Sequence, residues 1–325
     1  MAELIDQYGR RLNYLRISVT DRCNFRCTYC MPAEGVPCLS HEEILRYEDI
    51  KFLCRVFTEL GVVKFRFTGG EPLVRKGLVP FLKELREELP GIKIALTTNA
   101  SLLGEYAGAL AQAKIDSLNI SLDTLDPEKF ASVTRTGKIE AVLAGIRAAG
   151  KAGIKNIKLN TVLVRGFNDH EICELLKFAR ENGLLLRLIE FMPIEDGIWD
   201  KSAYISGEEI LSMLPGGGKW EKTFTEHKDA DGPAEYYRNE KSGDRIGIIT
   251  AVSNHFCKNC NRLRISAEGS LRSCLFNPRE TALKEIIRMR DPAALREAIL
   301  RAVSEKPRCW NDVKTGSLHM SGIGG

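Results

Sequence analysis

The chain has 325 residues, of which 44% are hydrophobic and 28% are charged, values that are ordinary for a globular protein. Its 47 basic and 43 acidic residues leave a net charge of +4, which is too small to predict a nucleic-acid-binding surface. No apolar run is long enough to cross a bilayer, so we also expect no membrane span.

The first segment, residues 1–11, is charged and lacks the apolar core of a signal peptide, which predicts a cytoplasmic protein. In that reducing compartment the ten cysteines favour metal binding over disulfides. Six of them fall into two groups, within residues 23–30 and 257–274. The other four are predicted to be small buried apolar side chains: Cys38, Cys54, Cys173 and Cys309.

Short apolar strands and amphipathic helices alternate through the first two-thirds of the chain, with a repeat of roughly 30 residues that is typical of βα units. Strands are expected to end near Val19, Phe67, Leu96, Ile120, Leu159 and Ile189. Helices are expected over Glu42–Leu60, Val79–Glu88, Leu102–Ala113, Ile139–Lys151 and Glu171–Asn182. Six such units predict a parallel sheet and are fewer than a full barrel needs, and a doubly wound sheet is the second interpretation.

Three cysteines directly follow the first expected strand: Cys23, Cys27 and Cys30. Thiolates are soft ligands that select iron–sulfur clusters, zinc or Cu(I). A structural zinc site needs four ligands, and no fourth Cys or His lies at the usual short spacing. On a cluster of four irons, three thiolates leave one iron open to bind another molecule.

Polar residues follow all six apolar strand bodies, as at Thr97 and Ser121. The carboxyl ends of parallel strands meet at one mouth of a barrel, so these residues predict a ligand site there, although loops begin at strand ends in any case. After the second strand, the run from Gly69 to Pro72 would let the backbone approach a ligand closely. A tight turn explains that run equally well.

Basic side chains interrupt the strands where apolar residues are expected: Arg16, Lys64, Arg66, Lys158 and Arg187. Buried cations are costly unless they are paired. One interpretation pairs them with carboxylates such as Glu71 or Glu190. The other places a polyanion such as a triphosphate inside the barrel, because arginine side chains match phosphate oxygens.

The repeat stops after Pro193, and residues 196–244 predict loops and short helices, followed by a strand over Arg245–Val252. We therefore divide the chain into a core, residues 1–195, and an extension, residues 196–325. A helical stretch from Thr281 to Val303 is expected to pack on the extension. The polar tail, residues 307–325, would by base rates be a frayed terminus.

The second cysteine group lies around a predicted hairpin. Strand alternation places Cys260, Arg262 and Arg264 on one face, and a turn at Glu268-Gly269 would bring Cys274 back beside Cys260. Together with Cys257, three thiolates then converge. A zinc site completed by His255 is one interpretation, and a second cluster with an open iron is the other.

The spacing Cys-x3-Cys-x2-Cys, with an aromatic residue before the third cysteine, resembles the cluster loop of radical S-adenosylmethionine (SAM) enzymes. Within them, the chain resembles the GTP 3′,8-cyclase family, which begins molybdenum cofactor biosynthesis. The closer resemblance depends on Arg16-x-Ser18-Val19-Thr20-Asp21-Arg22-Cys23-Asn24, on Phe67-Thr68-Gly69-Gly70-Glu71-Pro72, on Cys257-x2-Cys260-Asn261-Arg262-x-Arg264 with Cys274, and on Ile323-Gly324-Gly325. The segment Ile265-Ser266-Ala267-Glu268-Gly269 differs from the Leu-Thr-x-Asp-Gly that is more usual in the family, and this difference affects no catalytic residue.

The resemblance implies a partial (βα)6 TIM-type barrel with a C-terminal α+β extension, and two 4Fe-4S clusters. The clusters would be held by Cys23, Cys27 and Cys30 and by Cys257, Cys260 and Cys274. SAM would contact Tyr29, Gly70, Ser121 and Met192. GTP would contact Arg16, Arg66, Thr97, Lys158, Arg262 and Arg264. The tail glycines Gly324 and Gly325 would reach the active site.

The reaction implied is that of a radical SAM lyase. A 5′-deoxyadenosyl radical would abstract hydrogen from C3′ of GTP, and that carbon would attack guanine C8 to give 3′,8-cyclo-7,8-dihydro-GTP. A reductant protein, a downstream cyclic pyranopterin monophosphate synthase and a homodimer are further expectations. Two alternatives stay open: a radical SAM enzyme with an auxiliary cluster acting on a peptide, and a non-catalytic zinc or iron–sulfur module.

Overall fold

The structure is a computed structural model of the chain that describes residues 3–193, 200–223 and 232–313. The tail glycines Gly324 and Gly325 lie outside the described residues. Within the described ranges, no helix has both the length and the apolar content to span a bilayer.

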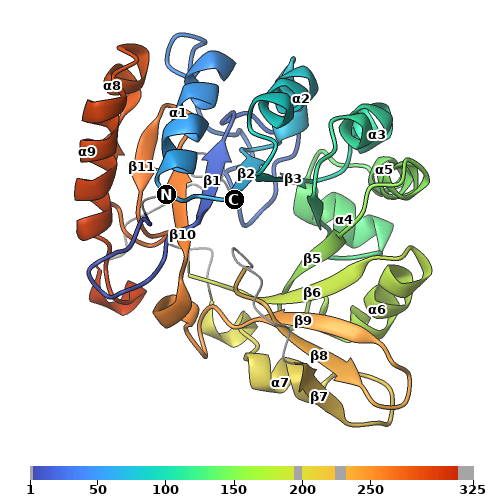
Figure 1. Cartoon of the computed structure of the whole chain (residues 1–325). Coiled ribbons are helices and arrows are strands. Elements are labelled where there is room, and N and C mark those ends of the chain that lie inside the picture. The colour runs from blue at the N-terminus through green and yellow to red at the C-terminus, as the bar shows by residue number, and fades with distance from the viewer. Residues whose placement is uncertain (1–2, 194–199, 224–231, 314–325) are drawn as a thin grey trace.

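A single sheet curves through the centre of the molecule (Figure 1). In the order of the sheet, its strands in the described residues are β12 (Thr281–Ala282), β11 (Ser270–Arg272), β10 (Arg262–Ile265), β1 (Tyr14–Ser18), β2 (Lys64–Thr68), β3 (Lys93–Thr98), β4 (Ser117–Ser121), β5 (Ile157–Leu163), β6 (Leu185–Glu190), β9 (Arg245–Ile249), β8 (Glu235–Asn239) and β7 (Trp220–Thr223). Strands β1 to β6 are parallel and lie in sequence order. This order confirms the partial barrel, because a doubly wound sheet reverses its strand order at a switch point.

The extension joins this sheet at both edges. Strand β10 pairs in parallel with β1, and β9 pairs in parallel with β6. Antiparallel strands then complete each side, β11 and β12 beyond β10 and β8 and β7 beyond β9. The prediction of only loops and short helices for residues 196–244 was therefore wrong, since β7 and β8 lie there.

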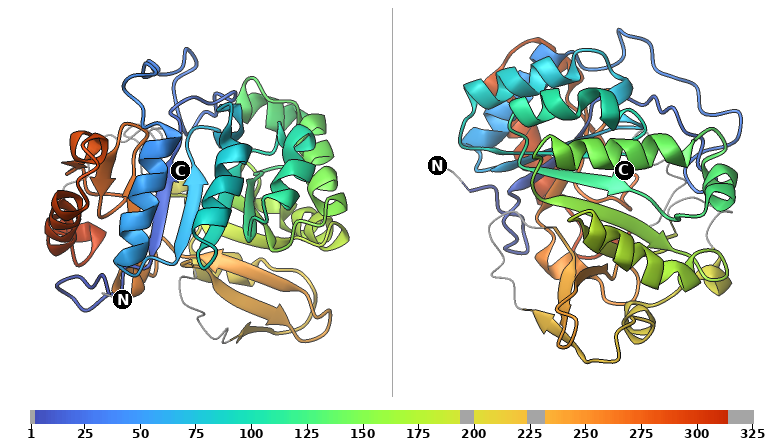
Figure 2. Two further views of the ribbon diagram at one scale, coloured as in Figure 1. Left: turned by 45° about the horizontal axis from the view of Figure 1, so that its top comes forward. Right: turned by 90° about the vertical axis from the view of Figure 1, so that its right-hand side faces the viewer.

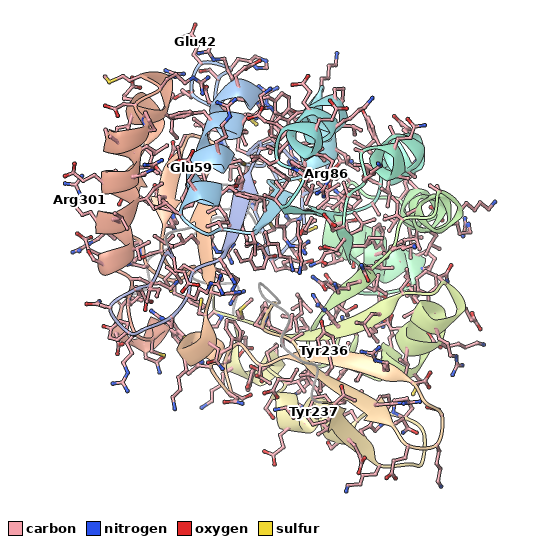
Figure 3. All side chains as sticks on the ribbon, in the orientation of Figure 1. Glu42, Glu59, Arg86, Tyr236, Tyr237 and Arg301 are labelled. Atoms are coloured by element: carbon pink, nitrogen blue, oxygen red, sulfur yellow. The ribbon has the colours of Figure 1, made fainter. Side chains whose placement is uncertain are left out.

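Helices cover the outer face of the sheet (Figures 1 and 2). In the barrel they are α1 (Tyr47–Glu59), α2 (Leu78–Glu88), α3 (Leu103–Gln112), α4 (Pro127–Thr134), α5 (Ile139–Lys151) and α6 (Ile172–Glu181). Their inner faces are apolar, while charged side chains such as Glu42 and Arg301 project from the outside of the molecule (Figure 3). Strand β2 shows how the two faces of the sheet differ. Phe67 packs edge-on against Phe81 of α2 on the outer face, while Arg66 lies on the opposite face and lines the cavity.

Two helix predictions need correction in the barrel. Helix α1 begins at Tyr47, five residues later than expected, where Asp49 accepts a hydrogen bond from the Arg46 backbone N–H (3.0 Å). Helix α4 was missed, although Asp126 caps its first turn and Pro127 stands at its first position. It is short, and it matters because Phe130 packs on Phe25 inside the first cysteine loop.

The extension contributes α7 (Gly207–Ser212), α8 (Lys284–Arg288) and α9 (Pro292–Ser304). The single helix expected from Thr281 to Val303 is divided, because Arg290 has a positive φ and Asp291 caps a new helix. Helix α9 packs on β11 of the extension, as expected, and also on α1 of the barrel.

Candidate functional site

One cavity of about 360 Å³ opens among the strands, within the range of ligand pockets. The residues predicted to hold the clusters or to contact SAM and GTP all line it: Arg16, Cys23, Cys27, Tyr29, Cys30, Arg66, Gly70, Thr97, Ser121, Lys158, Met192, Cys257, Cys260, Arg262, Arg264 and Cys274. The two cysteine groups are separated by more than two hundred residues of sequence, yet they share this space. Which ligand each residue contacts stays a prediction.

The first cysteine loop is fixed by backbone hydrogen bonds to the end of α4. Arg26 N–H donates to the Thr134 carbonyl (3.0 Å), and Thr28 N–H donates to the Val133 carbonyl (2.9 Å). Burial raises the pKa of Cys23, and burial together with Cys30 and Asp123 raises that of Cys27 far above its usual range. Burial and negative charge therefore keep these thiols protonated in the absence of a cation, and bound iron would stabilise their thiolate forms.

Tyr29 is held in place by a buried carboxylate. Its hydroxyl donates to Asp123 Oδ2 at 2.5 Å, and Asp123 Oδ1 accepts from Val162 N–H at 2.9 Å. Burial raises the pKa of both Tyr29 and Asp123, and the negative charge of Asp123 raises that of Tyr29 further. The aromatic ring beside Cys30 is thus oriented by the loop that follows β4.

Gly70 is required by a close contact between two loops. A Cβ atom there would lie 2.4 Å from the Arg22 carbonyl oxygen and 2.9 Å from that of Asp21. Gly70 N–H also donates to the Thr20 carbonyl (3.0 Å). The glycine therefore lets the loop after β2 lie against the segment that leads into the cysteine loop, a reason that the sequence alone did not reveal.

The two carboxylates that the sequence offers as partners for the strand cations, Glu71 and Glu190, accept hydrogen bonds from nearby loops. Glu71 accepts hydrogen bonds from Thr98 Oγ1 (2.7 Å) and Asn99 N–H (2.7 Å), and burial raises its pKa to about 7. Glu190 accepts from the backbone N–H groups of Gly207 and Val252, both at 2.6 Å. Each carboxylate fixes loops at the mouth of the barrel.

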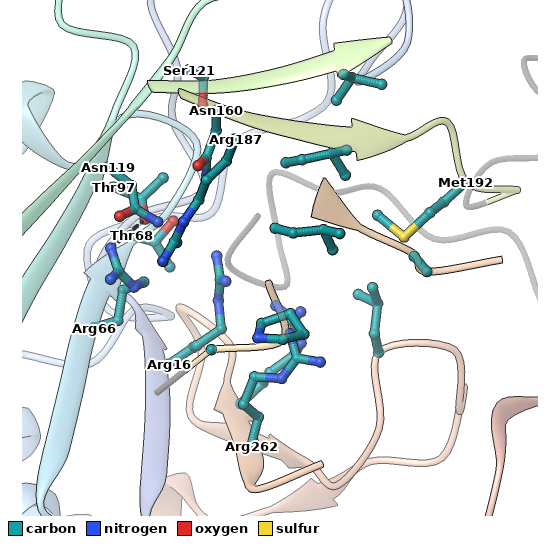
Figure 4. Close-up of a pocket in the computed structure, with 18 of the residues that line it drawn as sticks. Arg16, Arg66, Thr68, Thr97, Asn119, Ser121, Asn160, Arg187, Met192 and Arg262 are labelled. Atoms are coloured by element: carbon teal, nitrogen blue, oxygen red, sulfur yellow. Dashed lines mark hydrogen bonds between the residues drawn. The ribbon is translucent and has the colours of Figure 1, made fainter. Parts of the chain in front are cut away.

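The arginines form a row across three strands. In the register of the sheet, Arg264 of β10, Arg16 of β1 and Arg66 of β2 are direct neighbours. Figure 4 shows Arg16, Arg66 and Arg187 pointing into the same space. Burial lowers the pKa of Arg264, and the positive charge of the neighbouring Arg16 lowers it further. Burial also lowers the pKa of Arg16, to about 10. Like charges gathered in this way favour an anionic ligand.

Tyr14 lies one pleat away, between Arg262 and Lys64 in the register, and sequence reasoning missed it. Arg66 Nε donates to its hydroxyl. Burial alone would raise the pKa of Tyr14, but Arg66, Arg16 and Lys64 outweigh that effect and lower it to about 7. The phenol therefore acts as a partial counter-anion among the cations.

Three buried polar atoms at the cavity have no hydrogen-bond partner among the described residues: Asn119 Oδ1, Asn160 Oδ1 and Arg187 Nε. Buried polar groups are normally satisfied, so these atoms indicate a ligand. Asn119 was missed, although its alternation with Ser121 on β4 could have revealed it. Figure 4 shows both asparagines beside the arginines.

The second cysteine group lies where the hairpin was predicted. Strands β10 and β11 pair antiparallel around the turn, with Arg264 opposite Arg272. Burial would raise the pKa of Cys260, but Lys306, Arg262 and Arg10 together lower it to about 6. A stable thiolate in cationic surroundings fits ligation of a cluster.

The zinc interpretation receives no support from the described residues, among which no three His, Cys, Asp or Glu side chains are placed to hold one metal ion. His255 Nδ1 accepts a hydrogen bond from Trp310 Nε1 (2.8 Å). The thiolates of a four-iron cluster bind different irons, so they do not have to converge on one point.

The isolated cysteines were only partly understood. Cys54 is buried as predicted, whereas Cys38 and Cys173 are exposed. Cys309 is half-buried, which differs from the buried side chain that was predicted. Burial raises the pKa of Cys257, and the neighbouring Cys309 raises it further, to about 11.

Two family models match the chain: "Radical SAM superfamily" over residues 17–179 and "Molybdenum Cofactor Synthesis C" over residues 184–311. The chain is 45% identical over 307 residues to a GTP 3′,8-cyclase of Peptoclostridium acidaminophilum, covering 94% of this chain and 92% of that protein. It is 46% identical over 308 residues to a GTP 3′,8-cyclase of Moorella thermoacetica, covering 93% of each chain.

Among solved structures, SuiB of Streptococcus suis matches with a TM-score of 0.52 at 21% identity, covering 64% of this chain and 46% of that one. SuiB bound to its precursor peptide SuiA matches with a TM-score of 0.51 at 22% identity, covering 61% and 44%. At this identity the likeness concerns the fold alone.

Proposed function

The chain belongs to the GTP 3′,8-cyclase family of the radical SAM superfamily, and we propose that it converts GTP to 3′,8-cyclo-7,8-dihydro-GTP in the first step of molybdenum cofactor biosynthesis. One observation carries the proposal: both cysteine groups and the strand-borne cations line the same cavity. In reaction terms the enzyme is a lyase that rearranges one nucleotide.

Membership of the superfamily implies a 4Fe-4S cluster and SAM. Cys23, Cys27 and Cys30 would hold this cluster, which fits their buried and negatively charged surroundings. When bound and reduced, the cluster and SAM supply the 5′-deoxyadenosyl radical. Tyr29, oriented by Asp123, would position SAM together with Gly70, Ser121 and Met192.

A second 4Fe-4S cluster would be held by Cys257, Cys260 and Cys274. The low pKa of Cys260 supports ligation, and the nearby Arg262 and Arg264 would bind the nucleotide on the same side of the cavity. Three thiolates would again leave one iron open to GTP.

The cations on the strands would bind the triphosphate. Arg16 and Arg66 lie side by side in the sheet, and Lys158 and Arg187 face the cavity from β5 and β6. Thr97 accepts a hydrogen bond from Arg66 Nη1 (3.2 Å) and so lies within reach of the same ligand. The unsatisfied oxygens of Asn119 and Asn160 are available to accept hydrogen bonds from ligand hydroxyl groups.

The remaining partners follow from this chemistry. A reductant protein would supply two electrons per turnover, one to cleave SAM and one that, with a proton, reduces the cyclised nucleotide radical. A cyclic pyranopterin monophosphate synthase would consume the product. The ten free cysteines favour a reducing cytoplasm. We further propose that the enzyme is a homodimer and that its tail, which ends in Gly324 and Gly325, reaches the active site. We also propose that residues 1–195 form the core and residues 196–325 the extension.

The test is anaerobic incubation of the reconstituted protein with GTP, SAM and a reductant, followed by chromatography of the nucleotides. We expect 5′-deoxyadenosine and the cyclised nucleotide in equal amounts, and about eight irons per chain. A variant with Cys23, Cys27 and Cys30 all changed to Ala should yield neither product. The finding of 5′-deoxyadenosine without any cyclised nucleotide would refute GTP as the substrate and favour a peptide substrate. Zinc in place of iron would favour a binding module.

A further inference from the structure

The segment that follows α9 buries a lysine beside the second cysteine group. Lys306 is 1% exposed, and its Nζ donates to the Arg262 carbonyl (3.1 Å) and to the Ser273 carbonyl. Arg262 follows Cys260 by two residues, and Ser273 directly precedes Cys274. The ammonium group therefore joins the two backbone segments of the hairpin that carry these cysteines.

The backbone around Lys306 is fixed on both sides. Its N–H donates to the Val303 carbonyl in the last turn of α9 (3.1 Å), and its carbonyl accepts from Gln7 Nε2 (3.3 Å). Arg10 Nη2 donates to the carbonyl of the next residue, Pro307 (2.7 Å). A backbone held in this way keeps the side chain in the interior, so its charge cannot reach water by a small movement.

The charge of Lys306 has no acidic partner in the part of the chain that the structure describes. The two acceptors of its Nζ are neutral carbonyl groups. A buried cation is costly unless an anion offsets its charge. Lys306 is also absent from the described residues that line the cavity, so it does not contact a ligand there. The anionic groups nearest in the chain to its two acceptors are the thiolates that Cys260 and Cys274 would contribute to a cluster.

We propose that Lys306 is a positioning residue of the second cluster, whose buried positive charge raises the reduction potential of that cluster. The inference rests on the second cluster of the proposed function. Three thiolates outweigh the positive charge of a four-iron core, and reduction by one electron makes the assembly more negative still. A buried positive charge therefore stabilises the reduced form more than the oxidised form, and net charge is one of the factors that set the potential of such clusters.

A second reading of the same contacts is purely structural. In that reading the two hydrogen bonds of Lys306 hold the hairpin together, and the charge on the nitrogen has no further effect. Loss of a structural contact lowers the amount of cluster that the protein binds. Only loss of a nearby charge also changes the potential of the cluster that remains bound, so the potential separates the two readings.

The test uses the full chain with Cys23, Cys27 and Cys30 changed to Ala, so that only the second cluster contributes a signal. After anaerobic reconstitution, the cluster is titrated with dithionite, and electron paramagnetic resonance measures the reduced fraction at each potential. Lys306→Met removes the charge and keeps an unbranched side chain of similar length. We expect the ratio of reduced to oxidised cluster at a given potential to fall at least about tenfold, which is a lowering of about 59 mV for a one-electron couple.

Two further variants serve as controls in the same background. Lys258→Met removes the same charge from an exposed lysine that lies between Cys257 and Cys260 in the chain. Water and salt screen that charge, so the potential should not change. Lys306→Arg keeps a positive charge at the buried position and should keep the potential of the background variant.

Each outcome has a separate meaning. No iron in the background variant would refute the second cluster, and the role of Lys306 with it. Iron present, with an unchanged potential in Lys306→Met, would refute the role of Lys306 alone, as would an equal shift in Lys258→Met. If Lys306→Met binds no iron while Lys306→Arg does, the positive charge is needed for the cluster and the inference stands. If neither variant binds iron, the lysine serves packing and the inference is overturned.

Discussion

At the scale of single residues, Tyr14 shows how the cavity tolerates its positive charge. The phenol lies between Arg262 and Lys64 in the sheet register and accepts a hydrogen bond from Arg66. Buried cations that face one another destabilise a protein unless a negative group stands nearby. Tyr14 supplies part of that charge before any triphosphate binds.

Tyr14→Phe should therefore remove a pH dependence of stability. The pKa of Tyr14 is about 7 in the folded chain against 10.0 for the free side chain. Between about pH 7 and pH 10 the unfolded chain binds more protons at this residue than the folded chain does. The contribution of Tyr14 to the free energy of unfolding therefore grows with pH up to about 10, and it is lost as the pH falls through 7. Urea unfolding at about pH 6 and pH 9 should show the difference between wild type and variant growing by at least about 1 kcal/mol. A difference that does not change with pH would contradict this role.

Arg66→Met should weaken the binding of GTP. The guanidinium faces the cavity and is held by the Leu96 carbonyl (2.9 Å), so it is preorganised for phosphate oxygens. We expect the Kd for GTP, measured by titration calorimetry, to rise at least about tenfold, or about 1.4 kcal/mol. Arg55→Met, which removes an exposed arginine on α1, is the control. If the two variants bind GTP equally well, Arg66 does not contact the substrate.

At the scale of elements, the loop after β2 acts through its backbone. Glycine at position 70 permits contact with the segment that leads into Cys23, while the next side chain, Glu71, connects the loop to the end of β3. The run from Gly69 to Pro72 thus fixes the position of the first cysteine loop, in addition to any contact that it makes with SAM.

Gly70→Ala should disturb the first cluster. The added Cβ would meet backbone atoms of Arg22 at 2.4 and 2.6 Å, which cannot move as a flexible side chain can. We expect a loss of about 1–3 kcal/mol in the free energy of unfolding, with lower iron incorporation and weaker SAM binding. Gly91→Ala, where nothing lies within 4 Å of the added atom, should change neither quantity. Full iron content in Gly70→Ala would show that the loop can adjust.

At the scale of the whole molecule, the extension and the barrel share one sheet. Strands β9 and β10 flank the six barrel strands, so the two cysteine groups are carried by one continuous framework. The N-terminal segment completes this arrangement, because Arg10 joins the loop of Cys257 to the chain that follows α9.

Arg10→Met should loosen the second site. Removal of one partner leaves Asp6 buried without its cation, and breaking a buried pair costs about 3–5 kcal/mol. Thermal unfolding should show that loss, and iron analysis in the variant with the first cysteine group replaced should show less iron. Arg11→Met is the matched control, because the ion pair of Arg11 with Glu3 is exposed and stabilises the fold by at most about 1 kcal/mol. Unchanged iron in Arg10→Met would mean that the second site does not depend on this connection.

The sequence by itself determined the six βα units, both cysteine groups and the cations of β1, β2, β5 and β6, since these depend on spacing and periodicity within short segments. Tertiary structure alone decided which edge of the sheet each extension strand joins, why Gly70 must be glycine, and that Asn119 and Asn160 lack partners. It also brought Arg10 to Cys257, 247 residues away, and Cys309 to the same group. Such contacts arise from the packing of elements that are distant in the sequence, and local residue patterns do not predict which distant elements will pack together.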